Sequence, residues 1–324
     1  MFVAVFVLSL FMVPLALDGE AYGLPGGTVG YYDGLSDDEK SIYKILAEPY
    51  GDDTVPTGEV WKSSESVSAG TEVETIDSIA KLMVLENPGL YWLWAAPELN
   101  DDDTLTFFPV DGLDKENPLK VMEDFVKELK SDLDQEHSIE DAVRAIDAKL
   151  RAKAKFAGEN AGTVAGTAFG VIVSGEADAF GFAAAFNYAI KELYSGTVDV
   201  LTVAGKLHDS EGYSEHAWNV IKDAEGVWYG VDVALNKIEN TDAYVMRASN
   251  DKGNSAGYTF AASHQPDLPG HTGLMAYFDI PEPYMREILP PEPPTAFEKY
   301  GPYVFVITII TVLSIVMIVY SRRG

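Results

Sequence analysis

The chain of 324 residues contains no cysteine. This absence excludes disulfide bonds, thiolate metal sites and a cysteine nucleophile. Basic residues are also scarce, because 23 Lys and Arg face 51 Asp and Glu and leave a formal net charge of −28. A nucleic-acid-binding protein needs a basic patch to displace the counterions of the phosphate backbone, so this charge argues against that class. The hydrophobic fraction of 47% is large enough for a substantial core, so the chain as a whole is not disordered.

The first residues are apolar and lack positive charge. Residues 2–17 are almost entirely apolar, end at a small-residue site near Ala16, and give way to Asp18 and Glu20. This pattern predicts a secretory signal peptide at residues 1–17. No Lys or Arg occurs before Lys40, so an uncleaved N-terminal anchor stays open as an alternative.

The C-terminal segment predicts a membrane anchor. Residues 303–320 carry no charge and approach the roughly 20 residues that a helix needs to cross a bilayer. Flanking tyrosines and the basic tail at 321–324 fit a transmembrane helix with a cytoplasmic C-terminus. The proline-rich residues 281–302 predict a semi-rigid stalk. We therefore expect a single-pass protein in the cell membrane, with the bulk of the chain outside the cytoplasm.

Local signals predict an N-terminal α+β region at 18–118 and a second domain at 119–280. Ser36 followed by Glu39, and Ser138 followed by Asp141, are capping-box patterns that begin helices. The expected helices begin at 36, 76, 119 and 138, and the expected strands cover 105–110 and 198–207.

A further helix is expected at 178–193, with a buried stripe at Phe182, Phe186, Ile190 and Leu193. Asp178 is the natural N-cap, which places Ala179 in the first turn. Free backbone N–H groups and the helix dipole would make a cysteine nucleophilic at that position, whereas alanine has no group to activate.

The stretch from 216 to 233 predicts a β-hairpin, because two alternating runs flank a turn signal at 223–226. A five-residue loop at 222–226 would place His216 opposite Asp232 and Trp218 opposite Gly230. Opposed side chains in such a pair lie close enough for an imidazole to hydrogen-bond a carboxylate. A slip of one residue would break the pairing.

A Cys-His-Asp enzyme has its nucleophile at a helix N-terminus, a histidine on a neighbouring strand and an acid that orients the histidine. The chain resembles the transglutaminase-like family in three runs, at 175–183, 216–219 and 226–232. The first run has Ala179 where the family has cysteine in G-x-x-x-C-x-G-Y-A. The resemblance implies an α+β, papain-like transglutaminase core, in which a helix packs on an antiparallel sheet, and it makes His216 and Asp232 the remnants of the triad.

The resemblance favours a pseudoenzyme that binds an extracellular peptide, protein or cell-envelope polymer in a former active-site cleft. The expected aromatic and polar contacts of that cleft are Trp218, Asn219, Trp228 and Tyr229. One alternative is a live transglutaminase or amidase-type acyltransferase with a non-cysteine nucleophile. Another is a structural surface spacer, in which the His216–Asp232 pair only braces the hairpin.

No cofactor and no metal site are expected from the sequence. It contains no GxGxxG, P-loop or HExxH motif, and the acidic loop at 100–103 lacks the spacing of an EF-hand. The remaining histidines show no ligand spacing and are expected on the surface or in loops, with the last two in a turn-rich loop bordering the cleft. They are His137, His208, His264 and His271.

Overall fold

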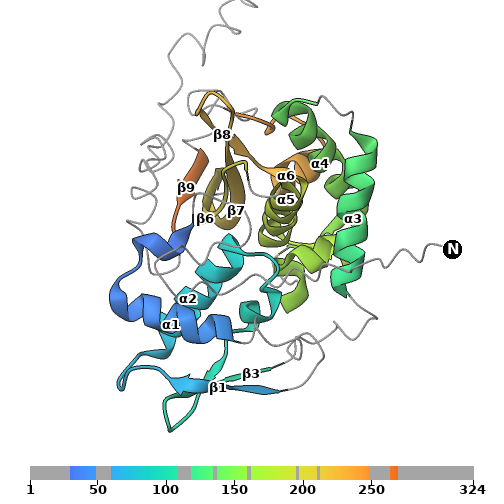
Figure 1. Ribbon diagram of the computed structural model, residues 1–324. Coiled ribbons are helices and arrows are strands. Elements are labelled where there is room, and N and C mark those ends of the chain that lie inside the picture. The colour runs from blue at the N-terminus through green and yellow to red at the C-terminus, as the bar shows by residue number, and fades with distance from the viewer. Residues whose placement is uncertain are drawn as a thin grey trace, which may run out of the picture. The chain divides into compact units, whose positions relative to one another are not determined.

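The computed structural model describes residues 30–48, 60–108, 118–133, 137–158, 162–194, 197–209, 212–247 and 263–268 (Figure 1). All of these residues belong to one compact unit, Met1–Ile288. The predicted signal peptide, stalk, transmembrane helix and tail lie outside the described residues and stay predictions. None of the helices within the described ranges has both the length and the apolar character of a membrane span.

The fold is α+β, as predicted. The α-helices are α1 Asp37–Ala47, α2 Val73–Glu86, α3 Pro118–Asp132, α4 Ile139–Lys153, α5 Ala179–Tyr194 and α6 Val233–Glu239. The strands are β1 Trp61–Ser66, β2 Glu98–Leu99, β3 Thr104–Phe107, β4 Lys155–Phe156, β5 Glu176–Ala177, β6 Val200–Asp209, β7 Gly212–Lys222, β8 Trp228–Val231 and β9 His264–Pro266. Short 3-10 turns η1 Tyr31–Gly34, η4 Tyr91–Ala95 and η6 Thr163–Gly166 and the π-turn η7 Gly170–Ser174 connect them.

Both predicted capping boxes are present. The Ser36 side chain accepts a hydrogen bond from the backbone of Glu39, and the Glu39 side chain accepts one from the backbone of Ser36. Ser138 and Asp141 form the same reciprocal pair at the start of α4. These local bonds satisfy N–H groups that the first helical turn leaves without partners, which is why both helices begin where the sequence predicts.

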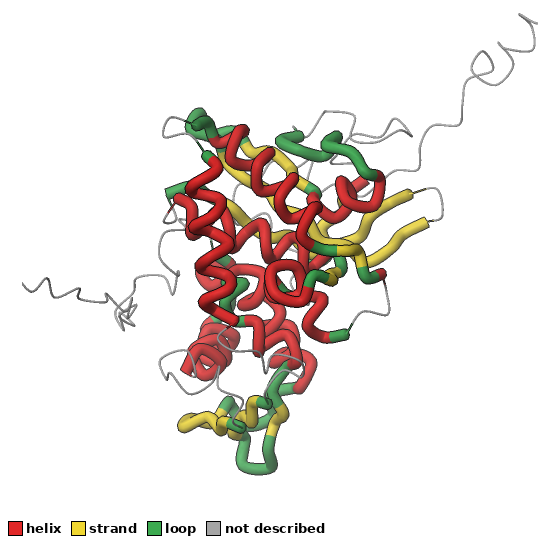
Figure 2. The backbone as a smooth tube through the Cα atoms, turned by 90° about the vertical axis from the view of Figure 1, so that its right-hand side faces the viewer, coloured by secondary structure: helices red, strands yellow, loops and turns green. Residues whose placement is uncertain are grey.

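Two antiparallel sheets position the rest of the chain. The main sheet has the order β8-β7-β6-β9, and a smaller sheet has the order β1-β3-β2. Helix α5 packs on β6 and β7, so the expected helix on an antiparallel sheet is confirmed. Figure 2 shows the two sheets at different ends of the described region, with helices between them. The predicted boundary at 118–119 follows the undescribed residues 109–117 and stays a prediction.

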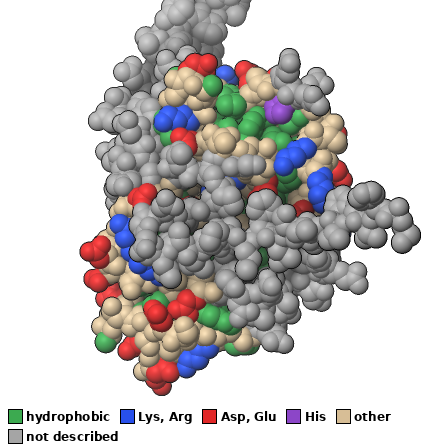
Figure 3. Space-filling view, in the orientation of Figure 1, with side chains coloured by type: hydrophobic (Ala, Val, Ile, Leu, Met, Phe, Trp, Pro, Cys, Tyr) green, Lys and Arg blue, Asp and Glu red, His purple; other side chains and the backbone are tan. Residues whose placement is uncertain are grey.

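Acidic side chains mark the described surface. Figure 3 shows more acidic than basic groups on the visible face, in keeping with the net charge of −28. Several of the basic groups lie in exposed ion pairs, such as Lys62 with Asp102 at 2.9 Å and Arg144 with Glu140 at 2.7 Å. The described surface therefore carries more acidic side chains than the basic side chains can pair with.

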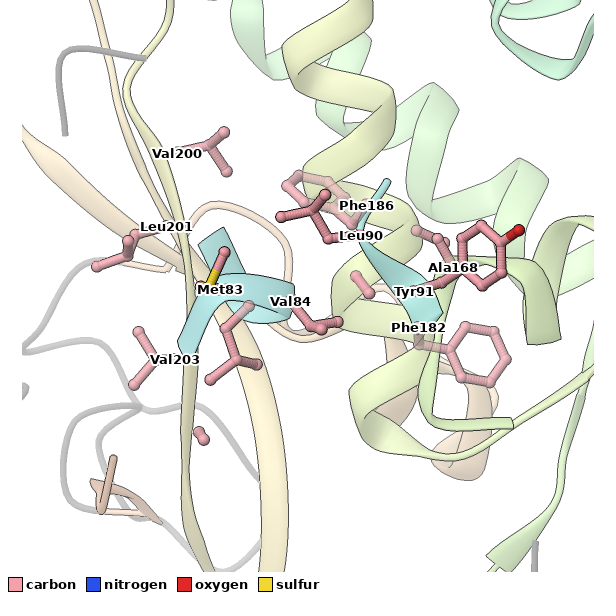
Figure 4. Packing of buried hydrophobic residues seen from close by; sticks show 14 of the residues in the cluster. Met83, Val84, Leu90, Tyr91, Ala168, Phe182, Phe186, Val200, Leu201 and Val203 are labelled. Atoms are coloured by element: carbon pink, nitrogen blue, oxygen red, sulfur yellow. The ribbon is translucent and has the colours of Figure 1, made fainter. Parts of the chain in front are cut away.

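The core joins α2, η4, α5 and the main sheet. Figure 4 shows Phe182 and Phe186 of α5 near Tyr91, with Met83 of α2 on the side toward Val203 of β6. All five side chains are buried. Residues from both predicted regions thus share one hydrophobic cluster.

The predicted buried stripe of α5 is largely confirmed. Phe182, Phe186 and Ile190 are fully buried, whereas Leu193 is half-buried in the last turn. Asn187, on the same helix, donates hydrogen bonds to the Leu85 backbone oxygen at 3.1 Å and to Thr202 Oγ1 at 2.8 Å. These two bonds fix α5 to α2 and to β6, and so fix the position of its N-terminus.

Candidate functional site

The hairpin of β7 and β8 forms, but its predicted register is wrong by two residues. Ile221 pairs with Tyr229, and Gly230 lies opposite Val220 rather than Trp218. The five-residue loop is 223–227, one residue later than predicted. Because side chains alternate with a period of two, a shift of two keeps every side chain on its predicted face. His216 and the chain after β8 therefore still meet.

Asp232 is the first part of this meeting point. It does not lie on a strand as predicted, because β8 ends at Val231 and Asp232 is the N-cap residue of α6. Its Oδ1 accepts a hydrogen bond from the Leu235 backbone N–H at 2.8 Å. Its Oδ2 lies 2.6 Å from Nε2 of His216, which is 3% exposed. The predicted imidazole–carboxylate contact is thus present, and a helix start fixes the carboxylate.

His264 is the second histidine on this carboxylate. It lies in β9, is fully buried, and places Nε2 3.0 Å from Asp232 Oδ2. Its Nδ1 lies 2.9 Å from Ser263 Oγ. The expectation that His264 lies on the surface or in a loop is wrong. No local signal marks β9, because three residues that include Pro266 show neither alternation nor a turn on both sides.

Gly205 of β6 makes room for the backbone of β9 and for the Trp218 ring. It pairs with His216 on one side and with Pro266 on the other. A Cβ atom at this position would collide with the Gln265 backbone oxygen and the Trp218 ring. The glycine expected beneath Trp218 is therefore Gly205, not Gly230. The His216 and His264 rings come within 6.0 Å between centroids.

Burial and charge act in opposite directions on the Asp232 carboxyl. Burial alone would raise its pKa, because the charged form loses its hydration. The charges and hydrogen bonds of His216 and His264 outweigh burial and hold the pKa of Asp232 well below its ordinary value. The cluster therefore keeps an ionised carboxylate in the protein interior.

The start of α5 is built as predicted, with Ala179 at the position of the nucleophile. Asp178 Oδ1 accepts the Gly181 backbone N–H at 3.0 Å, as an N-cap does. Burial raises the pKa of Asp178, while the backbone N–H groups and the charge of His216 act to lower it. The charge of His216 therefore acts on the carboxyl that caps this helix. Ala179 is buried there and offers only a methyl group.

The other predicted contacts do not gather in one place. Trp218 is buried beside the cluster, with its ring 5.1 Å from that of His264 in an edge-on arrangement. Asn219 points to the opposite face of β7 and donates to the Ala183 backbone oxygen at 3.1 Å. Trp228 and Tyr229 lie at the turn end of the hairpin, away from His216. Of this set, only Trp218 lies at the cluster.

The remaining histidines are separate from the cluster. His137 is partly exposed, with its ring 6.0 Å from that of Tyr194. His208 lies on β6, with its ring 4.8 Å from that of Tyr213. His271 lies outside the described residues.

The fold and the site define an α+β protein with a buried His-Asp-His cluster and a helix start whose capping carboxyl is affected by the charge of one histidine. No protein-family model matches the chain. No curated protein matches it either. Among solved structures, it is similar to a transglutaminase at 13% identity and a TM-score of 0.31, over 42% of this chain and 43% of the other. A protein from Cytophaga hutchinsonii, named as a candidate cysteine protease, has 12% identity and a TM-score of 0.29, over 40% and 51%.

The chain thus spans about half or less of each solved structure that it resembles. Likeness at this level says nothing about activity.

Proposed function

We propose that this chain is a membrane-anchored, extracytoplasmic transglutaminase-like pseudoenzyme that binds a peptide, protein or cell-envelope polymer at a former active site. The observation that carries the proposal is the buried His216–Asp232 contact, together with a capped helix start whose nucleophile position is Ala179. An imidazole held by a carboxylate can take a proton from a thiol, but the methyl group of Ala179 has no acidic proton and cannot become a nucleophile. Since the chain has no cysteine, no thiol elsewhere replaces it.

The anchored, extracytoplasmic location rests on the sequence pattern at both ends of the chain, at 1–17 and 303–320. The binding role rests on what the site retains. The carboxylate, both histidines and the Trp218 ring are each in contact with a neighbouring group. The polar and aromatic groups of the former site thus stay together, with the Trp218 ring edge-on to His264.

The restored nucleophile tests whether the catalytic frame survives. In the full chain, Ala179→Cys introduces the only thiol, so iodoacetamide labelling reports on this position alone. We expect an apparent thiol pKa well below the ordinary value of about 8.5, because the helix N-terminus and a nearby imidazolium stabilise the thiolate. Replacing His216 by Ala in the same chain should raise it again. A chelator keeps metal ions from masking the thiol.

A matched control comes from Ser131→Cys, an exposed position in the last turn of α3. Its thiol should titrate near the ordinary value, because a helix C-terminus disfavours negative charge. If the thiol at position 179 titrates like this control or does not react, the site is not a catalytic frame and the structural-spacer alternative gains support.

Ligand binding tests the second half of the proposal. Binding of the full chain to a peptide panel and to cell-envelope polymer should be saturable, and Trp218→Ala should weaken it. Trp218→Phe keeps an aromatic ring and should retain most of the affinity. Equal binding by all three proteins would show that the ligand lies elsewhere.

A further inference from the structure

Three ligand atoms converge at the start of α6. His216, Asp232 and His264 each offer one ligand atom, these three atoms lie within 4.8 Å of one another, and all three side chains are buried. They come from β7, from the residue after β8, and from β9, so the folded sheet assembles them from distant parts of the sequence. We propose that His216, Asp232 and His264 together bind one divalent transition-metal ion, with zinc as the test ion. This inference goes beyond the proposed function and does not depend on it.

The donor set suits this class of ion. Imidazole nitrogen and carboxylate oxygen are ligands that zinc and its first-row neighbours share, whereas calcium and magnesium prefer oxygen alone. Three protein ligands are also the number found in zinc sites that keep one position open for water or another ligand. The site therefore fits an ion that accepts a further ligand.

The surrounding groups orient the ligand atoms as metal sites require. Asp232 Oδ1 is occupied by the Leu235 N–H, which directs Oδ2 toward the histidines. His264 Nδ1 faces Ser263 Oγ, and a hydroxyl can donate to or accept from this nitrogen. The ring can thus release Nε2 to an ion while Nδ1–H donates to the serine. Such outer-shell bonds to ligating histidines are the rule in metal sites.

Charge also favours an ion here. Asp232 is fully buried, and within the described part of the chain no Lys or Arg forms an ion pair with it. Its partners are the two histidines, which are neutral when they act as metal ligands, and a buried carboxylate without a cationic partner is then unfavourable. A divalent cation supplies that charge without a side chain that would need its own space.

Binding of an ion requires the three ligand atoms to move. The two imidazole nitrogens lie 2.6 and 3.0 Å from Asp232 Oδ2. Zinc–nitrogen bonds of about 2.0–2.1 Å place tetrahedral ligand atoms about 3.3 Å apart. Each ring nitrogen must therefore withdraw from Asp232 Oδ2 by less than about 1 Å, and ligand atoms that lie up to 4.8 Å apart must approach one another by up to about 1.5 Å. β9 is a three-residue strand whose only partner among the described strands is β6, and a strand held on one side can let His264 move.

Zinc titration of the metal-stripped full chain tests the proposal. Calorimetry should show one saturable ion per chain, and cobalt substitution should give the visible absorption of a four-coordinate nitrogen–oxygen site. His264→Gln is the decisive variant, because its amide N–H can still donate to Asp232 while a good metal ligand is lost. Its affinity for zinc should fall by more than the roughly 10–100-fold that outer-shell losses cost.

Two controls separate this site from the acidic surface. His208→Gln removes a histidine of β6 outside the cluster and should leave zinc affinity unchanged. Excess calcium in high salt should displace surface-bound ions but not the buried one. Zinc binding that is lost in calcium, that is equal in His264→Gln and wild type, or that lacks a one-ion endpoint would overturn the proposal. The thiol experiment contains a chelator, so its result stands whichever way the metal titration falls.

Discussion

At the scale of single residues, Glu86 should give the protein a distinctive pH dependence. Its side chain is 3% exposed, and Oε2 accepts hydrogen bonds from the Tyr31 backbone N–H at 3.2 Å and from the Tyr43 hydroxyl at 3.3 Å. Burial raises the pKa of Glu86 from 4.5 to about 7, and the nearby charge of Lys191 lowers it only in part. The folded protein therefore keeps this carboxyl protonated at pH values where the unfolded chain ionises it.

The sign of the effect follows from that difference. Because the folded pKa is the higher one, the contribution to stability is complete below pH 4.5 and is lost as the pH rises through 7. A difference of this size corresponds to roughly 3 kcal/mol. The free energy of unfolding of the full chain, measured in urea, should therefore fall between pH 4.5 and 8 by up to about 3 kcal/mol more for the wild type than for Glu86→Gln.

Glu74→Gln is the matched control, because this exposed glutamate lies on the same helix. Its unfolding free energy should run parallel to that of the wild type across the pH range. A gap between wild type and Glu86→Gln that does not change with pH would show that Glu86 is ionised in the folded protein.

Residue-scale patterns identified part of the site. The contact between His216 and Asp232 was predictable, because the two lie close in sequence and flank one turn signal. His264 was not, because its contact depends on how β9 reaches β6 from far along the chain. The starts of α1 and α4 were predictable for the same reason, because Ser36 and Ser138 each form a capping box with the residue three positions later.

At the scale of elements, the hairpin shows what a period of two can and cannot determine. Alternation assigned His216 and Trp218 to their face, yet a register shifted by two satisfies the same alternation. Only the turn distinguishes the two registers. There the Asp223 N–H bonds the Val227 oxygen, and Asp223 Oδ1 accepts the Val227 N–H. The sequence marked the turn but not its first residue.

Gly205 offers a test of how the main sheet assembles the cluster. A Cβ at Gly205 would collide with the Gln265 backbone and with the Trp218 ring, and backbone cannot move aside as a flexible side chain can. Gly205→Ala should therefore separate β9 from β6, move His264 off Asp232, and cost about 1–3 kcal/mol. Urea unfolding measures the loss, and the zinc titration measures the displacement of His264.

Gly89→Ala controls for the general effect of replacing glycine. A Cβ at Gly89 meets no atom within 4 Å, so this variant should match the wild type in stability to within a few tenths of a kcal/mol and bind zinc unchanged. If Gly205→Ala also matched the wild type in both measurements, β9 would not hold His264 in place.

At the scale of the whole molecule, charge is the dominant feature. A net charge of −28 makes the compact state repel itself, and salt screens that repulsion. Salt also weakens attractive ion pairs, but the exposed ones, such as Lys62–Asp102 and Arg144–Glu140, contribute at most about 1 kcal/mol each. With more than twice as many acidic as basic residues, relief of repulsion should exceed the loss of these pairs.

The melting temperature of the full chain should therefore rise with sodium chloride. The rise should be steepest where the Debye length falls from about 30 Å at 0.01 M to about 10 Å at 0.1 M, because surface charges at such separations then stop interacting. Calorimetry at pH 7 measures it. A variant that combines Glu65→Gln, Glu74→Gln and Asp101→Asn, all at exposed positions, should show a shallower dependence. A melting temperature that falls with salt would mean that the ion pairs, rather than the excess of carboxylates, set the electrostatic balance of the fold.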